Sequence, residues 1–209
     1  IAVALDLEAD GDRALPVVRT LSELGDVEVE LLTVDSPNVP LAADDFELSR
    51  RATANGWPAH SYAALRSNDV AAAIVEHLRG RDDVLLVMAT TARRPVVGHL
   101  LGSVTEQVLA TIDQPVLLVG PGVPAELRWT APTPVLCIDD TDTAEGAVPM
   151  VAAWIHTFRS ARPCIAEVVA RAGLQTDAQR DLDASHARQY ASKLSAAGLD
   201  PSCRVVYDV

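Results

Sequence analysis

The sequence predicts an α/β protein in two successive units, the first complete and the second partial. Apolar runs of strand length alternate with segments of helical periodicity over residues 1–119. A stretch rich in Pro and Gly without periodicity follows at 121–134, and the alternation then restarts. Alternation at such intervals is typical of right-handed βαβ crossovers, and hence of a mainly parallel sheet covered on both faces.

The first unit, residues 1–120, is expected to contain five strands and four helices. Pro16 fits the first turn of the first helix, and Gly56 fits the end of the second. Short apolar runs predict strands at residues 1–6, 27–34, 59–64, 84–88 and 116–119. Helical spacing predicts helices at residues 12–24, 41–55, 69–78 and 103–112.

The fourth of these helices has a recognisable start and stop. Ser103 stands where a cap belongs, and Glu106 follows three residues later, a pattern that predicts a capping box. Pro115 breaks the helical pattern before the last strand. Capping is therefore a structural explanation of Ser103 that needs no ligand.

The second unit, residues 135–209, begins as a repeat of the first. Residues 3–6, Val-Ala-Leu-Asp, match residues 136–139, Leu-Cys-Ile-Asp, and residues 14–18 align without a gap on 147–151. Strands are expected at 164–169 and 204–207, with a long helix at 177–197. Half a parallel sheet exposes an apolar face and an edge, so we expect residues outside this sequence, the first unit or another chain to complete it.

Composition and charge exclude several classes of protein. The chain has 209 residues, of which 49% are hydrophobic, and a formal net charge of −12. Such a charge disfavours nucleic acid as a partner, and no apolar run reaches the roughly 20 residues of a membrane span, so no membrane insertion by this chain is expected. Three separated cysteines without a metal-ligand spacing predict reduced, mostly buried thiols and no metal site. No catalytic constellation stands out.

Residues 87–119 carry a specific resemblance. The run VMATTARRPVVGHLLGSVTEQVLATIDQPVLLV is similar to the signature of universal stress proteins, namely a strand, a Gly-x-x-Gly pair, nine residues, Gly-Ser, a helix and a Pro-Val-Leu strand. The spacing agrees throughout. Ala89 and Ala92 stand where the two loop glycines belong, and nine residues separate Ala92 from Gly102-Ser103.

The resemblance implies an open parallel five-stranded sheet of order 3-2-1-4-5, Rossmann-like and similar to the adenine nucleotide alpha hydrolase fold. In ATP-binding members, it implies, the Asp after the first strand lies near the nucleoside, the end of the second strand near adenine, and the glycine loop with Gly-Ser around the phosphates. The candidate site residues are Asp6, Val34, Met88, Ala89, Thr91, Ala92, Arg94, Gly102, Ser103, Val104 and Thr105.

The two alanines weaken the case for ATP. Glycine allows positive φ and a close approach of backbone N–H groups to phosphate, and an alanine Cβ obstructs both. Arg93 and Arg94 add positive charge nearby, although such a pair more often belongs to a solvated loop than to an anion site. Asp6 likewise fits a turn cap without any ligand. ATP therefore stays a candidate ligand with weak or no binding.

Three functions remain open. The first is a cytoplasmic stress-response protein that acts by binding and association, as a homodimer through the strand Val116–Val119, which resembles the family's dimerisation strand. The second is an ATP-binding stress sensor, with weak ATP hydrolysis as a variant of it. The third is a regulatory cytoplasmic domain of a membrane transporter. We favour the first, without enzymatic turnover.

Overall fold

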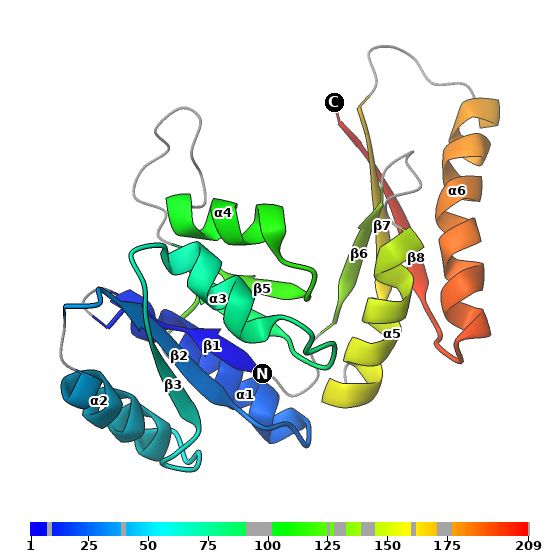
Figure 1. Ribbon diagram of the computed structural model, residues 1–209. Helices are drawn as coiled ribbons and strands as arrows, with labels where there is room; N and C mark the ends of the chain where they lie inside the picture. The colour runs from blue at the N-terminus through cyan, green and yellow to red at the C-terminus, as the bar shows by residue number, and fades with distance from the viewer. Residues whose placement is uncertain are drawn as a thin grey trace. The chain divides into compact units, whose positions relative to one another are not determined.

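A computed structural model describes residues 1–7, 10–38, 41–90, 102–124, 126–127, 133–138, 145–159, 162–170 and 177–208 (Figure 1). The chain divides into two compact units, Ile1–Arg128 and Trp129–Val209, which are described one at a time. The division between them falls inside the stretch 121–134 that the sequence predicts as a linker.

The first unit is built on one five-stranded sheet in which every neighbouring pair of strands is parallel. The strand order is β3-β2-β1-β4-β5, which confirms the order 3-2-1-4-5. The strands are β1 (Ala2–Ala4), β2 (Glu30–Asp35), β3 (Tyr62–Arg66), β4 (Leu86–Ala89) and β5 (Val116–Val119). β1 is therefore central, and β5 lies at an edge.

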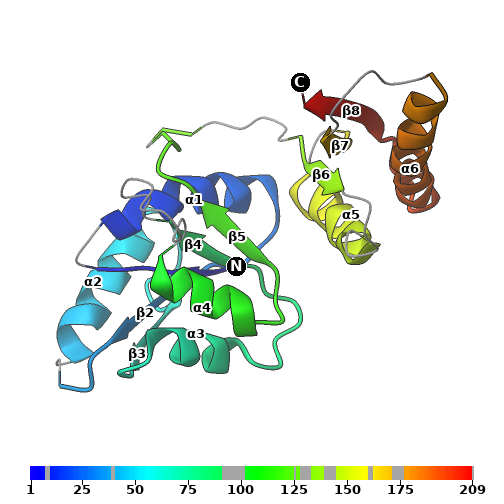
Figure 2. The same ribbon diagram turned by 90° about the horizontal axis from the view of Figure 1, so that it is seen from above.

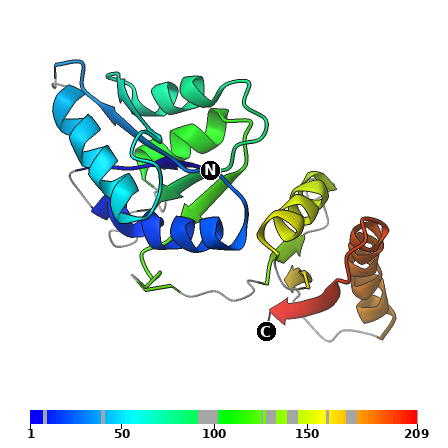
Figure 3. The same cartoon turned by 90° about the horizontal axis from the view of Figure 1, so that it is seen from below.

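Helices cover both faces of this sheet. The pair α3 (Val70–Leu78) and α4 (Ser103–Thr111) lies on one face (Figure 1). The pair α1 (Leu15–Leu24) and α2 (Leu41–Ala54) lies on the other, blue and cyan when seen from below (Figure 3). Asp69 caps α3 by accepting from the N–H of Ala72 at 2.9 Å, and Gly56, at φ 79°, follows the end of α2 as predicted.

The core of this unit forms where the helices meet the sheet. On the α3 and α4 face, buried apolar side chains pack together: Ala2, Leu32, Ala71, Ile74, Leu78, Val84, Leu86, Met88 and Val108. Burying one leucine or isoleucine in such a cluster stabilises the fold by about 1.5–3 kcal/mol. Most of the stability of the unit therefore comes from burying the apolar side chains whose periodic spacing is visible in the sequence.

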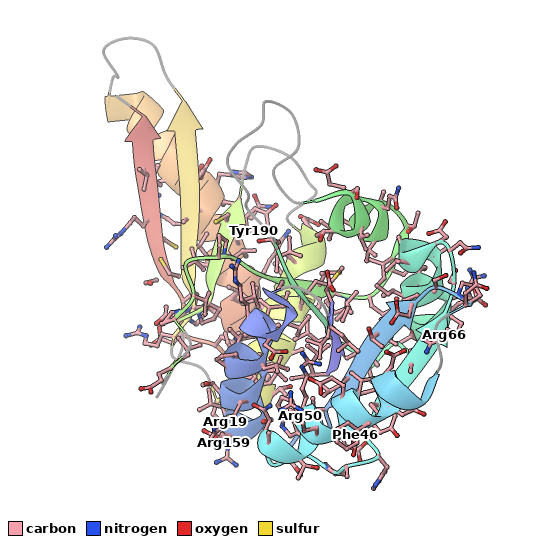
Figure 4. All side chains as sticks on the ribbon, turned by 90° about the vertical axis from the view of Figure 1, so that its left-hand side faces the viewer. Arg19, Phe46, Arg50, Arg66, Arg159 and Tyr190 are labelled. Carbon is pink, nitrogen blue, oxygen red and sulfur yellow. The ribbon has the colours of Figure 1, made fainter. Side chains whose placement is uncertain are left out.

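A short 3-10 helix, η1 (Asp10–Ala14), precedes α1 and packs closely on the end of β1. A Cβ added to Gly11 would lie 2.1 Å from the carbonyl oxygen of Asp6, so only glycine fits there. Arg51 of α2, whose side chain is 9% exposed, holds η1 in place with its Nε 2.6 Å from Asp12 Oδ1. Its neighbour Arg50 lies on the surface of α2 instead (Figure 4).

The predicted capping box at the start of α4 is wrong. The cap position is occupied by Gly102 at φ 94°, which has no side chain to bond to the helix end. A positive φ of this size favours glycine, which places the cap one residue earlier than predicted. Ser103 is therefore the first helical residue, and capping no longer explains it.

The second unit contains one three-stranded parallel sheet of order β6-β7-β8. Its elements are β6 (Val135–Ile138), α5 (Ala147–Phe158), β7 (Cys164–Ala170), α6 (Asp177–Ala196) and β8 (Ser202–Asp208). Both helices lie on the same face of the sheet (Figure 2). None of the described helices in either unit is both long and apolar enough to cross a membrane.

The core of the second unit lies on the helix face only. Its buried members are Leu136, Ile138, Ile165, Ala187, Tyr190 and Leu194. The opposite face of the sheet leaves Val135 54% exposed and Val206 44% exposed. Among the described elements of this unit, none covers that face.

The prediction of mostly buried thiols is wrong. All three cysteines are free, Cys137 and Cys203 are exposed, and Cys164 is half-buried. Side chains alternate along a strand, so Cys137 points away from the helices that cover Leu136 and Ile138. Cys137 is exposed because none of the described elements of this unit covers that face of the sheet.

An ion cluster lies at the amino end of β2. The carboxylate of Glu30 accepts from Arg81 Nη1 at 2.7 Å and lies 3.0 Å from His77 Nε2. Burial opposes its ionisation, but the bonds to Arg81 and His77 outweigh burial and lower the pKa of Glu30 below its ordinary 4.5. A lowered pKa means that this carboxylate stabilises the folded state above pH 4.5 and loses that effect as the pH falls further.

We predict that Glu30→Gln lowers the free energy of unfolding at pH 7 by about 1 kcal/mol. The difference from the parent should shrink as the pH falls below 4.5 towards the lowered pKa, because both chains then carry a neutral group. Urea unfolding at several pH values measures this. The control is Glu23→Gln, whose pair with Arg19 is exposed and should contribute little; an equal loss at every pH would contradict the ionic explanation.

Gly11→Ala should destabilise the first unit by about 1–3 kcal/mol, because its Cβ would meet the Asp6 backbone. Gly146→Ala is the matched control, since a Cβ there meets no atom within 4 Å. Thermal unfolding of both variants measures the difference. Equal melting temperatures would show that η1 shifts freely away from β1.

Candidate functional site

A cavity of about 500 Å³ opens at the carboxyl ends of the strands in the first unit. In open parallel sheets this is where ligands bind, at the point where the strand order reverses. Six elements line the cavity: the end of β1, η1, the end of β2, α3, β4 and the start of α4. The lining residues are Ala4, Leu5, Asp6, Leu7, Gly11, Leu32, Thr33, Val34, Asp35, Val70, Ile74, Met88, Ala89, Gly102, Ser103, Val104 and Thr105.

Backbone and hydroxyl bonds fix the ends of β1 and β2 beneath the cavity. The N–H of Leu5 donates to the carbonyl of Leu32 at 2.8 Å. The buried hydroxyl of Thr33 donates back to the carbonyl of Leu5 at 3.0 Å. Asp6, the next residue after Leu5, and Asp35, the last residue of β2, are thereby held at one edge of the sheet and line the same cavity.

The start of α4 forms another wall of the cavity. Gly102, Ser103, Val104 and Thr105 all line it. The first N–H groups of a helix have no partner within the helix, and they carry a partial positive charge. Ser103 is exposed and makes no cap bond, so its hydroxyl adds a polar group beside those N–H groups.

The remaining wall is apolar. Leu32 and Val34 of β2, Val70 and Ile74 of α3, and Met88 of β4 contribute to it. Val34 is half-buried, and Ile74 and Met88 are almost fully buried. An apolar wall with a few polar groups at one side is the usual make-up of a small-molecule pocket, and it suits a flat heterocycle joined to a polar group.

The structure brings together eight of the predicted site residues around this cavity: Asp6, Val34, Met88, Ala89, Gly102, Ser103, Val104 and Thr105. Thr91, Ala92 and Arg94 lie outside the described residues. Sequence reasoning missed Gly11, Thr33, Asp35, Val70 and Ile74. Asp35 was detectable as the polar residue that ends the second strand, whereas the wall from α3 depends on tertiary packing.

The electrostatics of the cavity are acidic. Of the described lining residues, only Asp6 and Asp35 are charged, and none is Arg, Lys or His. Arg66, in register with Asp35 on the neighbouring strand, forms an ion pair with Asp44 of α2 instead. The described residues contain no group of three or more His, Cys, Asp or Glu side chains that could hold a metal ion.

Comparisons with known proteins agree with this geometry. A universal stress protein from Archaeoglobus fulgidus DSM 4304 matches with a TM-score of 0.64 at 16% identity, over 100% of this chain and 79% of that one. A putative universal stress protein from Pseudomonas aeruginosa UCBPP-PA14 matches with a TM-score of 0.65 at 12% identity, over 98% and 74%. At these identities the likeness shows the fold.

The sequence itself gives the family. A search of curated proteins finds no match. The model of the universal stress protein family matches residues 1–120, more than half of the chain. That match spans all five strands of the first unit, including the strand ends and the start of α4 that line the cavity. The chain belongs to the universal stress protein family.

Proposed function

We propose that this universal stress protein acts in the cytoplasm by binding and association, without turnover, and that its first unit holds an adenosine-containing ligand in the strand-end cavity. The observation that carries the proposal is the convergence of eight predicted site residues on one cavity of about 500 Å³. An apolar wall for the base and a polar edge for the sugar match the two halves of such a ligand.

The described lining residues support binding rather than catalysis. They include no imidazole, thiol or amine that could serve as a base or nucleophile beside Ser103. The two carboxylates belong to neighbouring strands: Asp6 follows β1 by two residues, and Asp35 is the last residue of β2. Such carboxylates suit the recognition of hydroxyl groups as acceptors.

ATP itself should bind weakly. Ala89, which takes the place of the first loop glycine, ends β4 and lines the cavity. Its Cβ occupies space that a glycine would leave for a phosphate oxygen to approach the backbone. Ala92 makes the same change at the second glycine position in the sequence.

We predict a dissociation constant for Mg-ATP weaker than about 100 μM in titration calorimetry. Ala89→Gly together with Ala92→Gly should tighten it about tenfold, or about 1.4 kcal/mol, by reopening the backbone to phosphate. Ala54→Gly, at the exposed end of α2, is the control and should leave the affinity unchanged. Sustained phosphate release that Ser103→Ala abolishes would overturn the proposal of binding without turnover.

We also propose that two copies pair through the edge of β5. The carbonyls of Pro115 and Val119 accept from the N–H groups of Leu86 in β4 and of Thr90, the residue after β4. Backbone groups alternate between the two sides of a strand, so the N–H groups of Val116 and Leu118 point to the other side. A two-fold axis beside this edge would let these N–H groups in each copy donate to backbone carbonyls of the other copy.

Leu118→Pro should convert the dimer into a monomer, because proline removes one outward N–H from each copy. Leu118→Ala is the matched control, since it removes the same side chain and keeps the N–H. Light scattering after size exclusion, over a range of concentrations, measures the mass. A Leu118→Pro protein that dimerises as well as Leu118→Ala would exclude this edge.

A further inference from the structure

The open face of the second unit's sheet, the side opposite α5 and α6 (Figure 2), carries two cysteines on neighbouring strands. Leu136 and Ile138 of β6 are buried beneath the helices, so Cys137 between them lies on the open face, where it is exposed. Ile165 of β7 is likewise buried beneath the helices, so Cys164, which is half-buried, lies on the open face as well. The two thiols therefore share one face of adjacent strands.

The register of β6 and β7 sets the distance between these thiols. Cys137 pairs with Ala166, and Cys164 precedes Ala166 by two residues, so the cysteines are diagonal neighbours on parallel strands. Strands about 4.8 Å apart, with a rise of about 3.3 Å per residue, put such Cα atoms roughly 8 Å apart. A disulfide needs Cα atoms within about 6.8 Å. The geometry therefore disfavours a direct bond between the sulfurs and leaves room for an ion between them.

We propose that Cys137 and Cys164 bind one Cu(I) ion, held between their two sulfurs. Thiolates select soft ions, chiefly Cu(I), Zn²⁺ and iron–sulfur clusters. Zn²⁺ and iron–sulfur clusters need three or four protein ligands. Among the residues that the structure describes, no group of three or more His, Cys, Asp or Glu could hold a metal ion. Cu(I) accepts two sulfur ligands in a line, so it is the ion that a pair of thiols satisfies.

A positive charge on the same face suits the complex. Each thiol loses its proton on binding, so two thiolates and one monovalent cation together carry one negative charge. Cys203 of β8 donates its S–H to the carbonyl of Ala187 in α6 at 3.7 Å, so the next residue, Arg204, lies on the open face. Arg204 pairs with Ala166, in the same cross-strand row as Cys137. Its exposed guanidinium therefore favours the anionic complex electrostatically.

The third cysteine, Cys203, is a matched control within the chain. It is exposed, as Cys137 is, but its sulfur faces α6 on the other side of the sheet. Partial desolvation, and to a smaller extent the neighbouring thiol of Cys164, raise the pKa of Cys203 above its ordinary value. A raised pKa lowers the fraction of thiolate, which is the form that binds metal. Cys203 should therefore take no part in the site.

Competition between the full chain and a colorimetric Cu(I) chelator, in reducing and oxygen-free solution, tests this proposal. The parent should bind one Cu(I) ion per chain. Cys137→Ser and Cys164→Ser should each weaken binding at least about 100-fold, because a single sulfur cannot hold the ion against the chelator. Cys203→Ser should leave the affinity unchanged. Arg204→Gln should weaken it about threefold to tenfold, and less at high salt.

Melting curves without copper show whether each variant folds, and light scattering with copper gives the number of chains in the complex. Binding that survives Cys137→Ser or Cys164→Ser, or that Cys203→Ser abolishes, would overturn the proposal. One ion held between two chains would overturn it too, because the proposed site lies within one chain. A folded parent that leaves all the copper on the chelator would do the same, and the titrations of the first unit with ATP are independent of that result.

Discussion

A parallel sheet has two apolar faces, and both must be covered. In the first unit, α1 and α2 cover one face while α3 and α4 cover the other, so the central strand β1 is enclosed and Ala2 and Val3 are 0% exposed. The connections from β1 and from β4 must leave the sheet towards opposite faces. The cavity opens between them, at the carboxyl ends of the strands.

The second unit shows what happens when described helices cover only one face of a parallel sheet. Its two described helices lie on one face, and Val135 on the opposite face is 54% exposed. The predicted repeat aligns Val135 with Ala2, which is 0% exposed under α3 and α4. The different exposure of these two positions therefore reflects the covering helices and not the apolar character of the strands.

Sequence periodicity was sufficient for the elements of the first unit, because burial on both faces leaves a strong apolar signal, whereas the sheet order came from the resemblance to the family. It failed where the local structure depends on a single backbone torsion or on a partner far away in the sequence. The positive φ of Gly102 moved the cap away from Ser103, and the pairing of Arg66 with Asp44 joins residues 22 positions apart. Thr33 and Ile74 reach the cavity through packing that no local pattern encodes.

Two unrelated features of the first unit concern the same part of the proposed ligand. Ala89 and Ala92 replace the glycines that let backbone N–H groups approach phosphate. Separately, the nearby arginines Arg51 and Arg66 are held by carboxylates, and the described lining carries only negative charge. Neither feature alters the apolar wall of the cavity or the two carboxylates that can accept from hydroxyl groups. Under the proposed function, both features would weaken the recognition of phosphate and leave the recognition of base and sugar intact.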